Sequence, residues 1–523
     1  MNATLPTINE DHRRWYTLGA MCFALFMIML DNTVVNVALP SIQKDLNVSI
    51  SNLEWTVNAY TLTFAVLLVT GGRLGDIFGR RRMFLFGVIA FGASSLFIAF
   101  SQTDAWLIGG RALQGIGAAF MMPATLSIIT NAFPPHERGK AIGTWAGVSA
   151  IALAIGPVVG GFLVENVSWQ SIFLINVPVA IAAVGVTLWA THESRDETAP
   201  KVIDFPGVIT ISLGLGAIVL ALVEGNGWGW GSARVIGLLA GGLLALVLFV
   251  VAERRSAAPM VDFSFFRSRS FLGANIVAFI VSFAMLAMFF FLALYMQNIR
   301  GYSPLEAGVR FLPSTAIIIV AGPIAGRLAD KVGPRILMAL GLVFVAASLF
   351  WQGHLQPDTP YSFLVGAFVL MGAGMGLVMS PMSTAAMNAV DQAKAGVASG
   401  VLSMSRMVGG TFGVAIVGAL ISGLGRTRLH ELLPGATTGQ ITHLTEALAN
   451  GGAGINGPAG AAVQTAFVDA MNTSLRIGAA VALVGALVAW LLIADRPQAP
   501  APEVVADLSS HAVPDGAAVR AAV

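Results

Sequence analysis

One aspartate stands inside the first long apolar run of the chain. Asp31 lies about 16 residues into that run, in Leu30-Asp-Asn-Thr-Val-Val-Asn-Val-Ala-Leu-Pro40. A carboxylate in the middle of a membrane span costs about 2.5–3.5 kcal/mol on insertion scales. We therefore expect Asp31 to face a cavity or a cation, or to carry a proton for part of a cycle. A structural aspartate that hydrogen-bonds at a helix–helix contact is the alternative.

An arginine in the fourth apolar run is the candidate partner of this aspartate. Arg111 begins the segment Arg-Ala-Leu-Gln-Gly-Ile-Gly117. At a helical rise of about 1.5 Å per residue, Asp31 lies roughly 12–14 Å and Arg111 roughly 9 Å from the outer surface, a similar depth. The alternative is that Arg111 extends its head group to the outer lipid headgroups. The second half of the chain has Phe368 at the matching position, so the repeated scaffold does not require the charge.

A charged, glycine-rich segment occurs twice in the chain. Residues 72–82 read Gly-Arg-Leu-Gly-Asp-Ile-Phe-Gly-Arg-Arg-Arg, and a weaker copy begins at Gly326. Six positions recur with an offset of 254 residues, namely Gly72, Arg73, Leu74, Asp76, Gly79 and Arg81, so that Asp76 corresponds to Asp330. Later in the halves the offset drifts to 257 residues, so that Gly139 corresponds to Gly396. A charged loop repeated between apolar runs indicates a duplicated membrane unit. The alternative, a positively charged membrane anchor, does not explain the repeated glycines and aspartate.

Glycine and proline interrupt the fifth apolar run. Gly156, Pro157, Gly160 and Gly161 form Gly-Pro-Val-Val-Gly-Gly. Proline inside a helix removes one backbone hydrogen bond and favours a kink, whereas glycines allow close helix packing. The sequence leaves both interpretations open, and the second half keeps only Gly413 and Gly418 of this pattern.

Five further residues are candidates for lining a substrate cavity: Asn32, Asn36, Gln114, Phe290 and Arg406. Aromatic and methionine side chains around Phe290 suit an apolar pocket, although contact with lipid or core packing is the alternative. Arg406 is expected either to pair with a carboxylate or to bind an anionic group.

The composition shows what kind of elements must position these residues. Of the 523 residues, 56% are hydrophobic and 11% are charged, whereas about 25% are charged in soluble proteins. Such a chain belongs in lipid, and a span needs about 20 mostly apolar residues. The single cysteine, Cys22, excludes an intramolecular disulfide. We expect fourteen spans at 15–39, 54–71, 83–101, 105–130, 141–163, 170–190, 206–224, 233–252, 270–296, 305–325, 336–352, 361–386, 396–422 and 474–494.

The distribution of basic residues predicts the orientation. With both termini in the cytoplasm, about 20 of the 29 Lys and Arg residues lie inside, as the positive-inside rule requires. The repeat maps spans 1–6 on spans 9–14, so the expected fold is all-α: two six-helix repeats plus two inserted helices. The expected organisation is an N-terminal tail 1–14, a first bundle 15–190, a linker 191–205, inserted helices 206–252, a linker 253–269, a second bundle 270–494 with a long outer loop 423–473, and a disordered tail 495–523.

Several functions find no support in the sequence. It contains no Gly-x-x-x-x-Gly-Lys-Ser/Thr segment of a nucleotide-driven pump and no His-Glu-x-x-His or Cys/His cluster of a metalloenzyme. We expect no enzyme activity, no metal or cofactor, no nucleic-acid partner, and a monomer in the lipid bilayer. A periplasmic or envelope partner is left open.

The motifs together resemble the major facilitator superfamily, and specifically its fourteen-span drug:proton antiporter family. The resemblance rests on residues 72–82, Arg111-x-x-Gln-Gly-x-Gly117, Gly156-Pro-x-x-Gly-Gly161, Leu30–Pro40, Trp169-x-x-Ile-Phe-x-Ile-Asn-Val-Pro178 and Gly301-Tyr-Ser-Pro-x-x-Ala-Gly308, and it covers residues 10–495. Departures are Ile77, where the family turn is often basic, and Trp169-Gln-Ser in place of Trp-Arg-Trp.

The resemblance implies roles for the motif residues. It implies that Asp31 and Arg111 couple transport to protons. It implies a conformational latch in Gly72, Asp76, Gly79, Arg80 and Arg81, and an antiporter kink in Gly156, Pro157, Gly160 and Gly161. Asp330 belongs to the second copy of the latch segment, which we expect to be chiefly an anchor because Ala329 and Pro334 replace Gly75 and Arg80.

The expected function is export of amphipathic, mostly hydrophobic compounds across the cytoplasmic membrane in exchange for protons, with the proton gradient as the energy source. A dedicated exporter of an endogenous lipid, siderophore, antibiotic or other metabolite is the first alternative. A non-transporting membrane sensor or scaffold is the second.

Overall fold

The computed structural model describes residues 9–46, 50–198, 202, 204–256, 259–449 and 457–495. Regular structure in these residues is entirely helical, because a backbone in lipid must satisfy its own hydrogen bonds. The main helices are α1 (Glu10–Leu46), α2 (Ile50–Phe78), α3 (Arg80–Ala99), α4 (Asp104–Ala132), α5 (Pro135–Asn166), α6 (Ser171–Leu174), α7 (Asn176–Ala190), α8 (Phe205–Trp228), α9 (Ala233–Arg255), α10 (Arg269–Leu294), α11 (Pro304–Arg310), α12 (Leu312–Val332), α13 (Pro334–Gln352), α14 (Tyr361–Asn388), α15 (Ala395–Leu432), α16 (Thr438–Ala449) and α17 (Gly457–Leu492).

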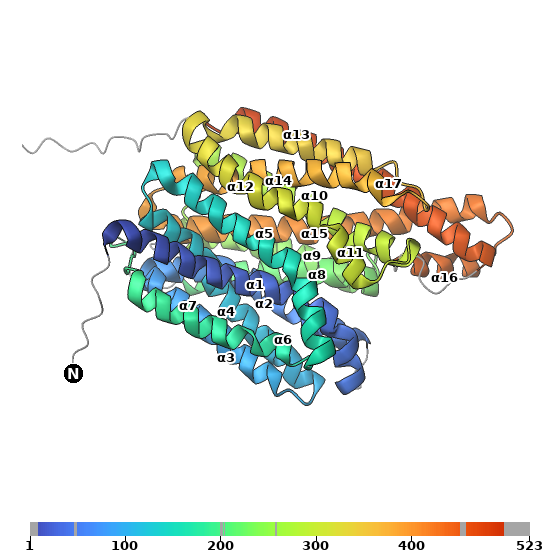
Figure 1. Cartoon of the computed structure of the whole chain (residues 1–523), viewed down its shortest axis with the longest axis horizontal. Coiled ribbons are helices and arrows are strands. Elements are labelled where there is room, and N and C mark those ends of the chain that lie inside the picture. Colours follow the sequence, from blue (N-terminus) through green and yellow to red (C-terminus); the bar gives the residue numbers. More distant parts are fainter. Residues whose placement is uncertain are drawn as a thin grey trace, which may run out of the picture.

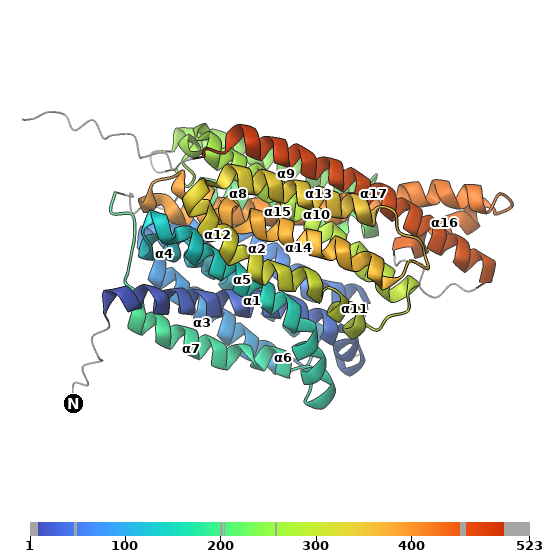
Figure 2. The ribbon, with the colours of Figure 1, turned by 45° about the horizontal axis from the view of Figure 1, so that its top comes forward.

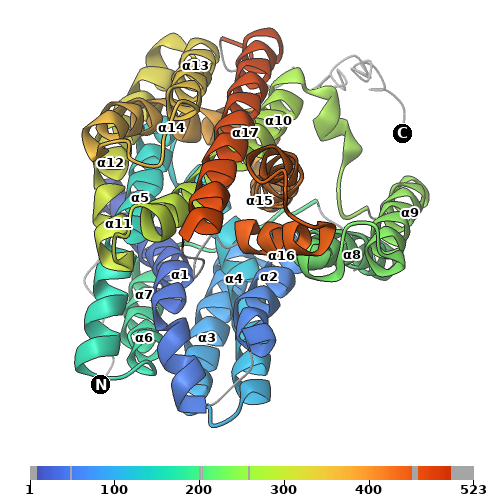
Figure 3. The ribbon, with the colours of Figure 1, turned by 90° about the vertical axis from the view of Figure 1, so that its right-hand side faces the viewer.

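The helices form two bundles with an inserted hairpin. Helices α1–α7 lie on one side and α10–α17 on the other (Figures 1 and 2). The hairpin α8–α9 lies at an edge of the molecule and packs on α2 and α15 (Figure 3). The predicted fold class, two six-helix repeats plus two inserted helices, is therefore confirmed.

Most expected spans coincide with long helices. Thirteen helical segments of the described chain are long and apolar enough to cross a membrane. The remaining expected span, 141–163, lies within the 32-residue helix α5. Two spans are interrupted: span 170–190 is divided at Ile175 between α6 and α7, and span 305–325 at Phe311 between α11 and α12.

The two charged repeat segments are not loops, which corrects the expectation from sequence. Residues 72–78 continue α2, and α3 begins at Arg80. Only Gly79 leaves the helix, with a positive φ of 111° that favours glycine. The second copy repeats this geometry with Gly333 at φ 89° between α12 and α13. We call the end of the molecule that contains Gly79 and Gly333 the turn end.

The segment 423–473 is likewise not a long loop. Helix α15 continues to Leu432 and α17 begins at Gly457, so both extend well beyond the expected spans. Helix α16 packs on these extensions, away from the start of α1 (Figure 1). Residues 450–456 and the tail after 495, like residues 1–8, lie outside the described residues.

Candidate functional site

Asp31 and Arg111 form a buried ion pair in the first bundle. A guanidinium nitrogen of Arg111 lies 2.6 Å from Asp31 Oδ2. Both side chains are almost completely buried, at 0% and 1% exposure. The prediction that the two residues reach the same depth is confirmed, and the alternative that Arg111 extends to lipid headgroups is wrong.

Neutral polar groups complete this charged pair. Gln114 Nε2 donates to Asp31 Oδ1 at 2.8 Å, and Asn176 Nδ2 donates to the same oxygen at 3.2 Å. Arg111 Nε donates to the Thr56 carbonyl at 3.0 Å, and its guanidinium lies 4.3 Å from the centre of the Tyr60 ring. Three donors, from Arg111, Gln114 and Asn176, thus satisfy the two oxygens of Asp31.

The glycines that follow Arg111 explain why the pair is inside the bundle. A Cβ atom on Gly115 would overlap Thr63 and the Tyr60 carbonyl of α2, and a Cβ on Gly117 would lie 2.7 Å from the Phe91 nitrogen of α3. These glycines therefore let α4 approach both helices closely. This close packing points Arg111 and Gln114 toward α1.

The glycines of α5 pack against α1 next to Asp31. A Cβ on Gly156 would overlap the Thr33 side chain, and one on Gly160 would lie 3.1 Å from Val34 Cα. A Cβ on Gly161 would meet nothing within 4 Å. Helix α5 is continuous through these positions, and the Pro157 side chain lies outside the described side chains. Close packing explains Gly156 and Gly160, while a kink at Pro157 stays a prediction.

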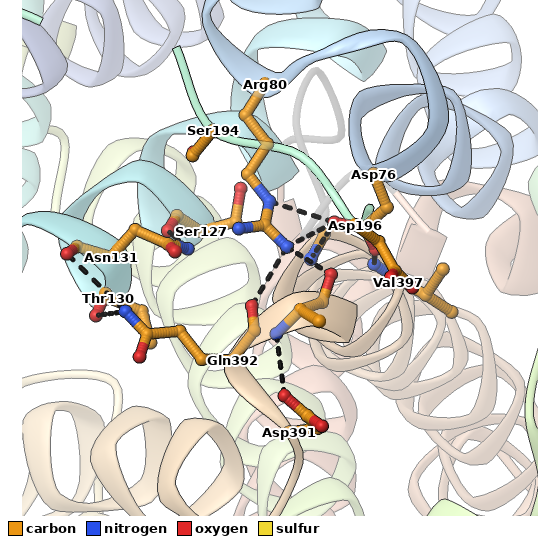
Figure 4. Close-up of polar contacts among 12 residues, drawn as sticks. Asp76, Arg80, Ser127, Thr130, Asn131, Ser194, Asp196, Asp391, Gln392 and Val397 are labelled. Atoms are coloured by element: carbon orange, nitrogen blue, oxygen red, sulfur yellow. Dashed lines mark hydrogen bonds and ion pairs between the residues drawn. The ribbon is translucent and has the colours of Figure 1, made fainter. Parts of the chain in front are cut away.

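Asp76 crosses from the first bundle to the second at the turn end. Its two carboxylate oxygens accept the backbone N–H groups of Gly396 and Val397, the second and third residues of α15, at 2.9 and 2.8 Å (Figure 4). The free N–H groups at a helix N-terminus favour such a carboxylate. Gly72 makes the approach possible, because a Cβ there would overlap the Gly396 carbonyl.

Arg80 strengthens the same contact. It binds Asp76 through two nitrogens, at 2.9 and 2.6 Å, and both side chains are at most 1% exposed. The guanidinium also donates to the Gln392 and Ala393 carbonyls of the second bundle, at 3.0 and 2.6 Å (Figure 4). One ion pair of the first bundle therefore binds the second through both partners. Asp76 accepts N–H groups of the first turn of α15, and Arg80 donates to carbonyl groups just before α15.

The second copy makes an equivalent contact, which corrects its interpretation as chiefly an anchor. Asp330 accepts the Gly139 N–H near the start of α5 at 3.2 Å. A Cβ on Gly326 would overlap the Gly139 carbonyl, just as Gly72 meets Gly396. Because Gly139 and Gly396 are themselves repeat partners, the halves close on each other through two copies of one contact.

The sequence interpretation assigned no role to two residues near these sites, Glu193 and Asn176. Glu193, in the segment after α7, accepts the Arg81 and Arg82 N–H groups at 3.0 and 3.2 Å and so caps the start of α3. Arg81 itself donates to the Leu188 carbonyl at 2.8 Å, within the same bundle. The role of Asn176 could have been inferred from the sequence, since an amide inside an apolar span needs a hydrogen-bond partner. The role of Glu193 could not, because no sequence pattern links it to α3.

The residues expected to line a substrate cavity do not form one group. Gln114 belongs to the Asp31 site, Asn32 Nδ2 donates to the Ile28 carbonyl at 3.0 Å, and Phe290 is 48% exposed. Arg406 is partly exposed, and its buried Nε finds no hydrogen-bond partner among the described residues. The Asn36 side chain lies outside those described.

Two similar helical bundles that enclose buried charges and meet through repeated contacts are the architecture of a membrane transporter. The sequence profile of the Major Facilitator Superfamily matches residues 21–414, and the chain belongs to this superfamily of multi-pass membrane transporters.

Relatives and solved structures agree with this assignment. The chain is 34% identical to the tetracenomycin C resistance and export protein of Streptomyces glaucescens, with 96% of each chain covered. It is 36% identical to the puromycin resistance protein pur8 of Streptomyces alboniger, covering 94% of this chain and 93% of that one. It also resembles in fold the proton:xylose symporter XylE, with a TM-score of 0.61 at 13% identity over 92% and 96% of the chains.

Proposed function

We propose that this protein exports amphipathic, mostly hydrophobic compounds across the cytoplasmic membrane in exchange for protons. The observation that carries the proposal is the buried Asp31–Arg111 pair, since a carboxylate inside a membrane transporter is suited to bind and release a proton. The resistance and export proteins named above support the direction of transport.

The proposed coupling is a competition at Asp31. Arg111, Gln114 and Asn176 stabilise the ionised carboxylate. A proton that enters from outside neutralises Asp31, weakens its attraction to Arg111 and favours release of the substrate. Loss of the proton to the cytoplasm restores the ion pair. The membrane potential contributes about 2.3 kcal/mol per charge per 100 mV to such an exchange when net charge moves.

The proposed latch is the pair of contacts at the turn end, which the positive-inside rule places in the cytoplasm. Asp76 with Arg80, and Asp330, join the halves there. Their closure corresponds to a conformation in which the cytoplasmic side is sealed. Opening of this side requires both contacts to break.

The test is an Asp31→Asn variant in proteoliposomes loaded with a fluorescent cationic dye. We expect normal membrane insertion but no dye export driven by a pH gradient, because asparagine cannot exchange a proton. Glu197→Gln is the matched control, since Glu197 is an exposed carboxylate. Undiminished pH-driven export by Asp31→Asn would contradict the proposal.

A dedicated exporter of one endogenous metabolite is the second candidate. It is favoured by relatives named for single compounds, including the cephamycin export protein CmcT of Amycolatopsis lactamdurans, 37% identical over 76% of this chain and 82% of that one. Deletion that leaves drug susceptibility unchanged while one metabolite disappears from the medium would favour this candidate over multidrug efflux.

A further inference from the structure

The inserted hairpin meets α2 around a small pocket at the turn end. The pocket is lined by Thr70, Arg73, Leu74 and Ile77 of α2, by Val202, Asp204 and Val208 around the start of α8, and by Met260. Thr70 and Arg73 precede the latch residue Asp76 by six and three residues. The pocket is therefore a contact between the hairpin and the helix that carries the latch.

Asp204 presents an unused carboxylate oxygen in this region. Its Oδ1 accepts the Gly207 N–H at 2.9 Å and so caps α8. Its Oδ2 is buried and has no hydrogen-bond partner among the described residues. The whole residue is 8% exposed, so bulk water does not satisfy this oxygen.

Glu253, near the end of α9, presents a second unused oxygen beside the first. Its Oε2 accepts the Val261 N–H at 3.2 Å, while its Oε1 is buried without a partner in the described part of the chain. A Cβ placed on Gly207 would lie 2.6 Å from Glu253 Oε1 and 3.1 Å from Asp204 Oδ2. The two unused oxygens are therefore less than roughly 6 Å apart, because both lie near one point.

Thr70 gives an independent indication that the pocket holds a ligand. The residue is 6% exposed, lines the pocket, and its Oγ1 has no hydrogen-bond partner in the described structure. The accessible space is about 10 Å³, close to the smallest space that holds one water, about 10–15 Å³. A water there can contact the Thr70 hydroxyl group and the Asp204 carboxyl group, which both line the pocket, whereas Glu253 lies on the other side of Asp204, outside the lining.

The charges around the two carboxyl groups do not balance. Glu253 is stabilised by the Val261 and Met260 N–H groups, repelled by Asp204 and attracted by Arg73 of α2. Within the described part of the chain, no hydrogen bond joins Arg73 to either carboxylate. Arg254 and Arg255 at the end of α9 are exposed. Asp262 of the following segment is paired with Lys394 at 2.7 Å. Two ionised carboxylates removed from water at this separation repel each other, so that one of them retains a proton.

We propose that Asp204 and Glu253 share one proton, and that a water molecule connects Asp204 to Thr70, which makes the junction of α2 and the inserted hairpin a proton-binding site separate from Asp31. Movement of α2 changes the distance of Thr70 and Arg73 from the shared proton. The inserted helices thereby acquire a role: they expose the latch helix to the cytoplasmic proton concentration. The proposal does not depend on which compound the protein exports.

The test is infrared difference spectroscopy of the full-length protein in liposomes between acidic and alkaline buffer, without substrate. The measurement uses an Asp31→Asn background, which removes the band that a protonated Asp31 would itself give. We expect the C=O stretching band of a buried protonated carboxyl group in this background. Adding Glu253→Gln or Asp204→Asn removes it, because the remaining carboxyl group then ionises next to Arg73, whereas adding Glu197→Gln leaves it in place. A band that survives either pocket substitution, or that is absent from the Asp31→Asn background, overturns the proposal.

A variant that retains both carboxyl groups provides the second measurement. Thr70→Val removes only the hydroxyl group from the pocket, and its similar shape preserves the packing of α2. We expect the carboxyl band to shift in frequency, since the water loses one hydrogen-bond partner. An unshifted band in a correctly folded Thr70→Val protein contradicts the shared pocket, whatever the outcome of the transport assays.

Discussion

Replacement of Asp76 by asparagine should open the turn end much more readily than the same replacement of Asp330. Asp76 accepts two N–H groups of α15 and fixes Arg80, which donates to two further carbonyls of the second half. Asparagine keeps one acceptor oxygen but turns a donor group toward N–H groups, and it leaves Arg80 without its carboxylate. Asp330 accepts the Gly139 N–H at 3.2 Å and is also stabilised by the Lys140 N–H, but proline stands where the first copy has Arg80.

The expected magnitudes follow from these contacts. Breaking a buried ion pair by removing one partner costs about 3–5 kcal/mol. If this energy is lost only in the closed conformation, the open-to-closed ratio rises by roughly two to three and a half powers of ten. The hydrogen bond to Asp330 is charge-assisted and contributes about 1.5–3 kcal/mol, so Asp330→Asn should change the same ratio by roughly one to two powers of ten.

The assay is cysteine crosslinking across the halves. Cys22 is the single cysteine and is buried, so a Cys22→Ala background leaves only introduced thiols. Asn131 and Gln392 suit the pair, because Gln392 Nε2 lies 3.4 Å from the Asn131 carbonyl across the interface. Asn131→Cys with Gln392→Cys should crosslink rapidly in the closed form, much more slowly with Asp76→Asn, and at an intermediate rate with Asp330→Asn. Equal rates in the two variants would refute the reasoning from contact number.

Three other predictions concern the ion pair, the close glycine contacts and the effect of acid. Arg111→Lys keeps the charge but loses the donor to Thr56 and the planar contact with Tyr60, so dye export should respond less to the pH gradient than in the wild type; an unchanged response would show that a point charge suffices. Gly139→Val should prevent crosslinking at the turn end because its side chain would overlap Gly326 and Asp330, whereas Gly147→Ala, whose Cβ lies 3.6 Å from its neighbour, should crosslink normally. Burial raises the pKa of Asp262, but hydrogen bonds from Lys394 and Ser264 outweigh it and lower the pKa to about 2. The ordinary pKa of aspartate in an unfolded chain is about 3.9. The stabilisation of the folded protein by ionised Asp262 is therefore complete above that pH and is lost as the pH falls toward 2. Asp262→Asn should remove this small acid-dependent part of the thermal stability, and an identical pH dependence in the variant would contradict the assignment.

The sequence could predict the ion pair because lipid makes charges conspicuous. Asp31 and Arg111 each interrupt an apolar run, and helix geometry alone places them at similar depth. The neutral residues that complete the site, Gln114 and Asn176, were harder to recognise, since glutamine and asparagine occur in helices of many kinds. Their roles depend on how α4 and α7 rotate against α1, and that rotation is set by glycine contacts such as Gly117 with α3.

The helix boundaries at the turn end could not be predicted, for a related reason. Charged residues and glycines between apolar runs usually indicate a loop, yet residues 72–78 remain helical because Asp76 and Arg80 find partners inside the protein. Hydropathy identifies only the part of a helix that crosses the apolar layer, so it does not predict the extensions of α15 and α17 outside that layer. The alanine-containing segment 460–473 is still helical there because it packs on α15 and α16.

The difference between the two latch copies leads to a final prediction at Pro334. Arg80 corresponds by the repeat to Pro334, and the carbonyl groups that Arg80 contacts, of Gln392 and Ala393, correspond to Pro135 and His136. A cavity of about 290 Å³ is lined by Pro135, His136, Asp330 and Pro334, together with other residues. The cavity thus occupies the place that the Arg80 side chain fills in the first copy.

Arginine at this position should therefore complete the second latch. In Pro334→Arg, the new guanidinium is four residues from Asp330, as Arg80 is from Asp76, and it reaches the carbonyls at the start of α5. Proline is not needed there, because α3 begins with arginine after the equivalent glycine. We expect faster crosslinking at the turn end and slower transport, since opening must break a second buried ion pair. Pro334→Ala is the control for loss of the ring. If Pro334→Arg and Pro334→Ala behave alike, the cavity is not the counterpart of the Arg80 site, and the two halves close by different chemistry despite their shared backbone contacts.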